Sequence, residues 1–209
     1  MNKIIVVAHQ KGGVGKSTIA SNLATELAKH YTVNAIDLDL QKSLTYFNNI
    51  RRKSNLNAFN IINVESAKKL VQVINENKDV LLIDVGGYDS DINRLAIAGA
   101  DTLITPVSDS DIELVGLVAF RGILRDLRKK NPTLTAKVLF NKIHTRAGQN
   151  NKSLSDINSF ITKNPEFDKF KSMLRDRNDY KRAWGLGQSV IEYNNKAIDE
   201  MANLIDEVI

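Results

Sequence analysis

Residues 4–18 read IIVVAHQKGGVGKST, a short apolar run that passes directly into a glycine-rich loop. The first five residues have the length and the branched side chains of a buried strand, and the run is far too short to cross a membrane. The glycines that follow allow the chain to turn sharply, so that successive backbone N–H groups and the next helix N-terminus point at one place. Such a loop is typical of a phosphate-binding site. Its predicted nucleotide-binding residues are Lys11, Gly12, Gly13, Val14, Gly15, Lys16, Ser17 and Thr18.

Two lysines distinguish this loop from other phosphate-binding loops. Lys16 is expected to contact the β- and γ-phosphates, and the Ser17 hydroxyl is expected to coordinate Mg²⁺. The ordinary P-loop has a glycine five places before Gly15, but this chain has Gln10 there and an additional lysine at Lys11. A second cation in so small a loop is costly unless it pairs with concentrated negative charge. Triphosphates that face each other across a two-fold axis between two subunits would supply that charge.

The rest of the chain alternates between strand and helix patterns. We expect strands over residues 4–8, 33–38, 58–64, 80–83, 102–107 and 136–140, and helices over residues 16–29, 66–76 and 112–130. This order predicts an α/β fold, a mostly parallel twisted sheet flanked by helices on both faces. The length of 209 residues, of which 43% are hydrophobic, indicates a single domain over residues 1–209. A polar loop is expected over residues 145–153, and the absence of cysteine excludes disulfides and iron–sulfur clusters.

Aspartates follow two of the predicted strands. Asp37 and Asp39 end the strand that begins at residue 33, and Asp84 ends the strand that begins at residue 80. Because alternate residues on a strand share a face, both Asp37 and Asp39 are expected beside the phosphate loop if the strands are neighbours. Asp84 is predicted to hold Mg²⁺ through water, and Gly86 and Gly87 would form a mobile switch that offers an N–H to the γ-phosphate. The alternative is that these aspartates only end strands or cap helices.

The string from Lys11 to Thr18 resembles the deviant Walker A box of the ParA/MinD superfamily of P-loop ATPases. The resemblance implies ATP and Mg²⁺ as cofactors, and an ATP-sandwich homodimer in which Lys11 reaches the phosphates of the other subunit. Residues 37–43 are similar to the switch I motif of this superfamily, with Leu40 in place of the usual proline. That similarity implies that Asp39 orients the attacking water and that Asp37 helps to hold the magnesium shell. The implied catalytic residues are Lys11, Lys16 and Asp39.

The strand over residues 136–140 leads into the sequence Asn-Lys-Ile-His, which begins at Asn141. It is one residue short of the Asn-Lys-x-Asp motif with which GTPases read guanine. The imidazole of His144 cannot accept both guanine N–H groups as a carboxylate does, so adenine is favoured. Asn141 matches the base-contacting position of ParA-like proteins, and the alternative is an asparagine that caps the strand. We expect His9 and His30 to be structural. Trp184 is expected to lie in the core, and the alternative is that it stacks on a partner beside the glycine-containing loop that follows it.

Basic residues cluster in two places, in a chain whose net charge is +5. On the predicted helix over residues 112–130, arginines at i, i+4 and i+7 share one face. The second cluster, over residues 171–182, resembles a ParA segment near which basic residues contact DNA non-specifically. Affinity of such surfaces rises steeply with the number of phosphates neutralised, and the alternative for each cluster is a solvated surface. The candidate DNA-binding residues are Arg121, Arg125, Arg128, Arg175, Arg177, Lys181 and Arg182.

The C-terminal segment over residues 194–209 has the apolar spacing of a helix and an acidic balance of charge. One basic residue is outnumbered by four acidic ones, namely Lys196 against Asp199, Glu200, Asp206 and Glu207. MinD-like proteins end in a basic amphipathic helix that lies on the membrane, whereas an anionic bilayer would repel this tail. We therefore expect the tail to dock on the domain and expect no membrane partner.

These features predict a DNA-partition ATPase that resembles the small ParF kind, in the cytoplasm on the nucleoid. The chain begins directly with its first strand, so the helix-turn-helix extension of larger ParA proteins is not expected. A dimer formed around ATP and Mg²⁺ would bind DNA non-specifically, and a centromere-binding partner protein would stimulate its slow ATP hydrolysis. Three alternatives stay open: an ATPase that positions a chemotaxis cluster or microcompartment, a MinD-like membrane ATPase, and a metabolic ligase such as a dethiobiotin synthetase, which Lys11 disfavours. The cargo is not predicted.

Overall fold

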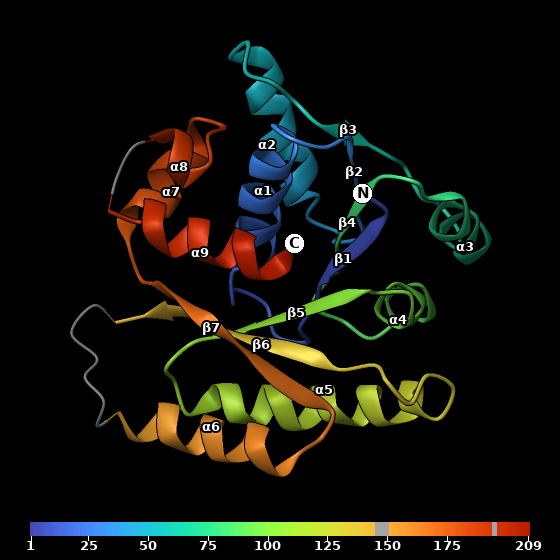
Figure 1. The fold of residues 1–209 in the computed structure, drawn as a ribbon, viewed down its shortest axis with the longest axis vertical. Helices are drawn as coiled ribbons and strands as arrows, with labels where there is room; N and C mark the ends of the chain where they lie inside the picture. The colour runs from blue at the N-terminus through green and yellow to red at the C-terminus, as the bar shows by residue number, and fades with distance from the viewer. Residues whose placement is uncertain (145–150, 194–195) are drawn as a thin grey trace.

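A computed structural model describes residues 1–144, 151–193 and 196–209 (Figure 1). Its strands form one sheet in the order β3-β2-β4-β1-β5-β6-β7, and every pairing between them is parallel. The strands are β1 Lys3–Val7, β2 Val33–Asp37, β3 Asn60–Ile61, β4 Val80–Asp84, β5 Thr102–Val107, β6 Ala136–Ile143 and β7 Phe167–Arg175. The predicted parallel α/β sheet is confirmed.

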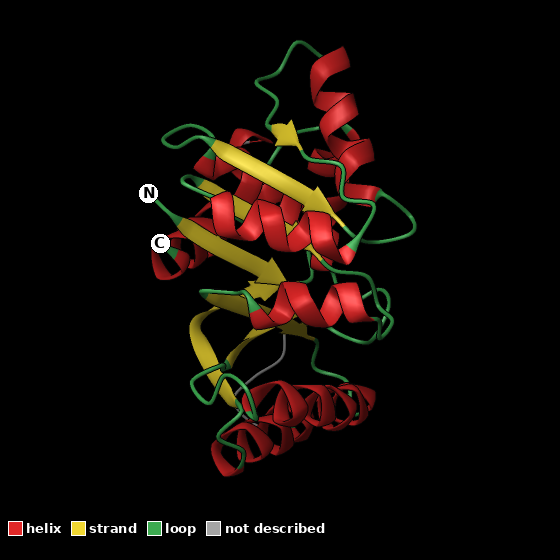
Figure 2. Cartoon of the chain, turned by 90° about the vertical axis from the view of Figure 1, so that its right-hand side faces the viewer, coloured by secondary structure: helices red, strands yellow, loops and turns green. Residues whose placement is uncertain are grey.

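Helices cover both faces of this sheet, as the side view in Figure 2 makes clear. The helices are α1 Lys16–Leu27, α2 Ser43–Lys53, α3 Ala67–Glu76, α4 Asp91–Ala98, α5 Ile112–Arg128, α6 Lys152–Lys163, α7 Asn178–Gly185, α8 Val190–Tyr193 and α9 Ile198–Val208. Side chains from α3 to α6 form one apolar layer with the sheet. Those from α1, α2, α7, α8 and α9 form the other.

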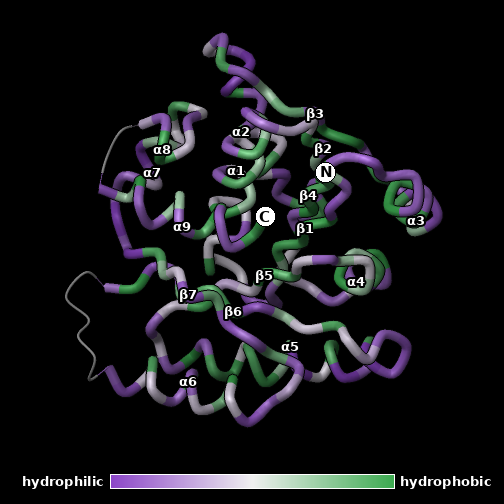
Figure 3. The backbone as a smooth tube through the Cα atoms, viewed as in Figure 1, coloured by the Kyte–Doolittle hydropathy of each residue, from purple (hydrophilic) through white to green (hydrophobic). Residues whose placement is uncertain are grey.

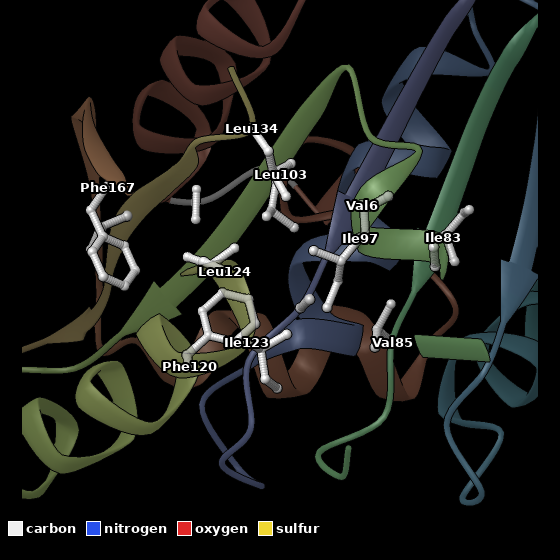
Figure 4. Packing of buried hydrophobic residues seen from close by; sticks show 14 of the residues in the cluster. Val6, Ile83, Val85, Ile97, Leu103, Phe120, Ile123, Leu124, Leu134 and Phe167 are labelled. Carbon is white, nitrogen blue, oxygen red and sulfur yellow. The ribbon is translucent and has the colours of Figure 1, made fainter. Parts of the chain in front are cut away.

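The central residues of strand β1 are all apolar because helices cover both faces of the strand. Ile4 and Val6 pack into the layer beneath α4 and α5, whereas Ile5 and Val7 pack into the layer beneath α1. Because successive side chains point to opposite faces, a strand covered on both sides must be apolar at every position. Figure 3 shows the hydrophobic strands at the centre of the molecule, and Figure 4 shows side chains of β1, α4 and α5 that meet in the first layer.

Three expectations about the elements need correction. The strand expected over residues 58–64 pairs with β2 only at Asn60–Ile61. The N–H of Ile62 still donates to the Ala35 carbonyl at 2.8 Å, and the side chains of Ile62 and Val64 pack against the α3–α6 layer. Strand β7 was not expected, since it is an edge strand whose polar residues interrupt the apolar pattern. The loop expected over residues 145–153 lies outside the described residues as far as 150, and helix α6 already begins at Lys152.

The C-terminal helix α9 packs against the sheet, as its acidic sequence indicated, although residues 194–195 of the tail lie outside the described residues. Met201, Leu204 and Val208 are fully buried in the layer beneath α1. The carboxylate of Glu207 accepts hydrogen bonds from the backbone N–H groups of β7, including that of Lys171 at 2.8 Å. Among the described residues, no helix combines the length and the apolar character needed to span a membrane.

Candidate nucleotide-binding site

The register of the sheet places three sequence motifs at one edge. Val7, the last residue of β1, pairs with Asp84 of β4, and Asp84 pairs in turn with Asp37 of β2. The loops that leave these three parallel strands therefore start side by side. This edge holds the glycine loop after β1, the aspartates after β2 and the glycine pair after β4, which is where ligands bind in open α/β sheets.

The glycine loop has a shape that only glycine allows at two positions. Gly13 and Gly15 have φ values of 77° and 98°, which L-residues rarely adopt. A Cβ on Gly15 would also lie 2.3 Å from Nδ2 of Asn141. That amide donates a hydrogen bond of 2.7 Å to the carbonyl of Val14, and Lys142 Nζ donates one of 2.6 Å to the carbonyl of Gly13. The end of β6 thus holds the loop in the conformation from which α1 begins.

The two lysines of the loop point in different directions. Lys16 is 5% exposed, and its Nζ donates to the Lys11 carbonyl at 3.1 Å. Burial lowers the pKa of Lys16, and the nearby carboxylates of Asp84 and Asp39 oppose that shift. Lys11 Nζ instead forms an ion pair of 2.6 Å with Glu113 in the first turn of α5. The Lys16 side chain therefore folds back onto the glycine loop, whereas the Lys11 side chain reaches away from the loop to Glu113 of α5.

Asp84 has the features of a cation-binding residue. It is fully buried, and neither of its carboxylate oxygens has a hydrogen-bond partner of ordinary geometry among the described residues. Burial raises the pKa of Asp84 to about 7, while the Ser17 hydroxyl and the Lys16 ammonium act in the opposite direction. A buried carboxylate with unmatched oxygens is costly unless a cation or its hydration shell satisfies it. The residues present therefore fit Mg²⁺, with Ser17 and Asp84 as the groups that would hold it.

Asp37 already has partners of another kind. Its Oδ2 accepts hydrogen bonds from the backbone N–H and the hydroxyl of Thr45 in the first turn of α2, at 2.9 and 3.0 Å. Its Oδ1 accepts from the N–H of Asp39 at 3.2 Å. Asp37 thus caps α2, the alternative that its sequence position left open, and its role in the magnesium shell stays a prediction. Asp39 Oδ1 accepts from the N–H of Gln41 at 2.9 Å, and its catalytic role also stays a prediction.

The glycine pair after β4 lies against both neighbouring loops. A Cβ on Gly87 would come within 3.4 Å of the Gln10 carbonyl in the phosphate loop, and one on Gly86 within 3.4 Å of the Asp39 Cα. Tyr88 Oη donates to the Leu38 carbonyl at 3.3 Å. The three loops therefore pack on one another at this edge of the sheet.

A cavity of about 290 Å³ opens next to the phosphate loop. Its lining residues come from α1, β6, the end of β7, the connection after it and α7. They are Thr18, Asn141, Lys142, Arg175, Asp176, Arg177, Tyr180, Lys181 and Trp184. Thr18 and Asn141 are the residues that the sequence predicted to bind nucleotide. Asp176, Tyr180 and Trp184 were not predicted for this site, because no spacing relates them to the glycine loop.

Trp184 is half-buried: it packs against the core layer that holds α1, α2 and α7, as expected, and it also lines the cavity. Its ring stacks on Tyr46 with centroids 5.9 Å apart, and the ring of Phe47 lies 6.0 Å away in a tilted arrangement. Both partners belong to α2, the helix that follows Asp37 and Asp39. The cavity wall is thereby joined to the loop that carries those aspartates.

The arginines of α5 that were predicted to bind DNA all have partners within the protein. Arg121 and Arg125 both form ion pairs with the buried Glu166, at 3.3 and 3.1 Å. Arg128 Nη1 donates to the carbonyls of Leu134 and Pro165, at 2.7 and 2.9 Å. The helical face expected on α5 thus exists, but its charges are partly satisfied within the protein.

The second basic cluster lies largely around the cavity. Arg175 Nη1 donates to the carbonyl of His144 at 3.1 Å, and Arg177 forms an ion pair of 2.5 Å with Glu200. Arg175, Arg177 and Lys181 line the cavity. Lys181 and Arg182, both on α7, are the two residues of the candidate set in this cluster that are exposed to solvent. DNA contact by any of these residues stays a prediction.

A parallel α/β sheet with a glycine loop between β1 and α1, and with aspartates at the ends of β2 and β4, defines a P-loop nucleotide-binding protein. The sequence itself matches the family described as the CobQ/CobB/MinD/ParA nucleotide binding domain over residues 5–190. The chain belongs to this family. The predicted membership of the ParA/MinD superfamily is confirmed.

Solved structures of ParA/MinD-type ATPases have the same fold. Apo McdA from Cyanothece is 20% identical, with a TM-score of 0.78 and coverage of 99% of this chain and 98% of that chain. A putative plasmid partition protein from Borrelia burgdorferi, bound to AMPPNP, is 21% identical with a TM-score of 0.73, covering 100% and 98%. MinD in the MinC–MinD complex of Aquifex aeolicus is 17% identical with a TM-score of 0.73, covering 98% and 94%. At these identities the similarity shows the fold.

One curated relative is more similar over a short stretch. An uncharacterized protein from Methanocaldococcus jannaschii is 54% identical over 44 residues, which are 21% of this chain and 17% of that protein. The match therefore spans less than a fifth of the relative's own length. It adds no activity to what the family and the site indicate.

Proposed function

We propose that this protein is an ATPase that partitions DNA or positions a cargo, and that it works as a dimer closed around ATP and Mg²⁺. The observation that carries the proposal is the position of Asp84. Its buried, unmatched carboxylate lies at the strand end next to the glycine loop, where Lys16 and Ser17 begin α1. A carboxylate, an ammonium and a hydroxyl gathered at one helix N-terminus fit a magnesium-bound triphosphate.

Each residue of this site has a distinct task in the proposed hydrolysis. The N–H groups of the glycine loop and Lys16 would bind the β- and γ-phosphates. Ser17 and Asp84 would hold Mg²⁺, which would supply positive charge to those phosphates. Asp39 orients the attacking water. Lys11 binds the phosphates of the partner subunit, so that the complete site forms only in the dimer. After hydrolysis, release of inorganic phosphate would remove the negative charge that holds two lysines between the subunits, and the dimer would separate.

The cavity beside the loop is the proposed site of the nucleoside. Thr18 and Asn141 connect it to the phosphate site, and the Trp184 ring offers an aromatic wall. His144 stands where a guanine-reading carboxylate would be required, which favours adenine over guanine. Burial raises the pKa of Tyr180, so this side chain stays a neutral hydrogen-bonding phenol beside the nucleoside.

DNA is the proposed surface on which the dimer is retained, through exposed basic residues such as Lys181 and Arg182 of α7. The affinity of a dimer for phosphates rises steeply because each contact occurs twice. A partner protein that reads the cargo would stimulate hydrolysis and release the dimer from the nucleoid. A non-DNA cargo would be positioned by the same cycle, with a different partner.

The test is retention on DNA with ATP, with ADP and without nucleotide, at two salt concentrations. We expect retention with ATP only, weaker at the higher salt concentration, and none for Lys16→Ala. Asp39→Ala should accumulate as an ATP-bound dimer that does not turn over. Retention by Lys16→Ala equal to that of the wild type, or a monomeric Asp39→Ala protein under ATP, would contradict the proposed cycle.

A further inference from the structure

The side chain of Lys11 forms an ion pair within its own subunit, so in this conformation its ammonium group is not available to bind phosphates of a second subunit. Its Nζ lies 2.6 Å from Oε1 of Glu113, in the first turn of α5. The proposed function requires the same ammonium to bind phosphates of the partner subunit. One ammonium cannot form close ion pairs with both groups when they belong to different subunits, so Lys11 must leave Glu113 before the dimer closes.

Glu113 is fixed by its surroundings rather than attracted to Lys11 from solvent. It is 2% exposed, and Ser108 Oγ donates to the same Oε1 at 3.0 Å. One helical turn further along α5, Gly116 packs so closely on the phosphate loop that a Cβ there would lie 2.7 Å from Cε1 of His9. His9 Nδ1 in turn accepts the backbone N–H of Lys11 at 2.9 Å. Helix α5 and the phosphate loop therefore meet in one rigid contact that positions both the backbone and the side chain of Lys11.

The departure of Lys11 leaves a charge without a partner. Oε2 of Glu113 is buried and accepts no hydrogen bond from any of the described residues, so the Lys11 ammonium is the cation that balances this carboxylate. Breaking a buried ion pair is costly because it leaves the remaining charge uncompensated in a medium of low polarity. The free energy gained when Lys11 binds the partner's phosphates must exceed this cost.

We propose that Glu113 is a positioning residue that holds Lys11 within its own subunit and thereby sets the nucleotide and protein concentrations at which the dimer forms. The inference rests on the proposed function, because the competing ligand of Lys11 is the triphosphate of the partner. Glu113 keeps the free protein monomeric until a triphosphate on the partner, with more charge than one carboxylate, competes for the ammonium. A diphosphate lacks the terminal group and leaves Lys11 on Glu113.

The test compares Glu113→Gln with the wild type and with Glu166→Gln. Glutamine keeps the size of the side chain and its hydrogen bond to Ser108 but removes the charge. Glu166→Gln is the matched control, because Glu166 is also a buried carboxylate paired with basic side chains of α5, Arg121 and Arg125. The dimer fraction is measured by sedimentation over a range of protein concentrations, with Mg²⁺ and the non-hydrolysable nucleotide AMPPNP.

We expect Glu113→Gln to dimerise at a protein concentration about tenfold lower than the wild type, while Glu166→Gln behaves as the wild type. The affinity of the monomer for AMPPNP, measured below the dimerisation range, should not change. Ser108→Ala loosens Glu113 without removing it and should give a smaller shift in the same direction, which keeps the test valid if Glu113→Gln folds poorly.

An unchanged or higher dimerisation concentration for Glu113→Gln and Ser108→Ala, with the wild type dimeric at high concentration, overturns the role of Glu113 alone. A tenfold shift that Glu166→Gln shares also overturns it, because the effect would then be one of removing any buried charge from this region. A wild-type protein that stays monomeric with AMPPNP at every concentration overturns the proposed dimer itself.

Discussion

Asp37 and Asp84 occupy paired positions at the ends of β2 and β4, yet the protein uses their carboxylates in different ways. Asp37 is satisfied by the first turn of α2, through the backbone N–H and the hydroxyl of Thr45. Asp84 is fully buried, and neither of its oxygens has a hydrogen-bond partner of ordinary geometry among the described residues. The two aspartates look alike in the sequence, but Asp37 is bonded to the first turn of α2, whereas the unmatched oxygens of Asp84 fit the cation site proposed for it.

This difference predicts that substitution of Asp84 affects Mg²⁺-dependent ATP binding, whereas substitution of Asp37 affects the stability of the fold. Asp84→Asn should reduce the Mg²⁺-dependent gain in ATP affinity by roughly 10-fold or more, without lowering the stability of the nucleotide-free protein, because it removes a buried charge that has no partner. Asp37→Ala should lower the free energy of unfolding by about 1 kcal/mol, since it deletes the cap of α2. Calorimetric titration with and without Mg²⁺, together with urea unfolding, measures both. A stability loss for Asp84→Asn as large as that of Asp37→Ala contradicts the assignment.

The glycine loop offers a matched pair of positions. Gly15 has a φ of 98° and lies against Asn141, whereas a Cβ on Gly12 meets nothing within 4 Å. Gly15→Ala should therefore cost about 2 kcal/mol or more, from the left-handed backbone and from displacement of the Asn141 amide. Gly12→Ala should change the free energy of unfolding by less than about 0.5 kcal/mol. Urea unfolding of both nucleotide-free variants checks the contrast, and equal losses would show that the loop is not held by β6.

Trp184 is the only tryptophan in the chain and lines the cavity proposed for the nucleoside. ATP should therefore alter the intensity or the maximum of the tryptophan emission, because the nucleoside would replace water beside the ring. Lys16→Ala should lose the response, and Trp184→Phe should lose the signal while it still binds ATP in a calorimetric titration. If the emission is unaltered at ATP concentrations where calorimetry records binding, the nucleoside does not bind in this cavity.

The features that could be predicted from the sequence are those that depend on residues close together in the chain. The apolar run over residues 4–8 gave the central strand, and the string from Lys11 to Thr18 gave the phosphate loop, because each pattern carries its own physical reason. The pairing of Lys11 with Glu113 joins residues 102 positions apart, and no local pattern marks such a pair. It depends on how closely α5 packs against the loop. Gly116 permits this close packing, but a single glycine in a helix pattern does not predict it.

Surface charge was the least predictable feature, for a physical reason. Arg121 and Arg125 form the basic helical stripe that their spacing indicated, but Glu166, which binds both, comes from the connection before β7. Strand β7 itself was missed because an edge strand buries few of its residues and shows no continuous apolar run. A sequence pattern therefore locates a patch of charge better than it tells whether the patch is free to bind a partner.

His9 predicts how stability depends on pH. It is buried against Phe120 and α5, and burial lowers its pKa from 6.5 to about 4, so the folded protein keeps it neutral while the unfolded chain protonates it. The contribution of His9 to the free energy of unfolding is therefore complete above about pH 6.5 and falls as the pH decreases toward 4, by about 2 kcal/mol between pH 7 and pH 5. The raised pKa of Asp84 changes the free energy of unfolding in the opposite direction over this range, so the effect of His9 is read as the difference between the wild type and a His9 variant. His9→Asn, whose amide oxygen can still accept the Lys11 N–H, should lose this part of the decrease, whereas the same substitution at the exposed His30 should retain it. Urea unfolding at pH 7 and pH 5 measures the difference. A wild-type decrease no larger than that of His9→Asn would mean that His9 accepts its proton without disturbing the contact between α5 and the phosphate loop.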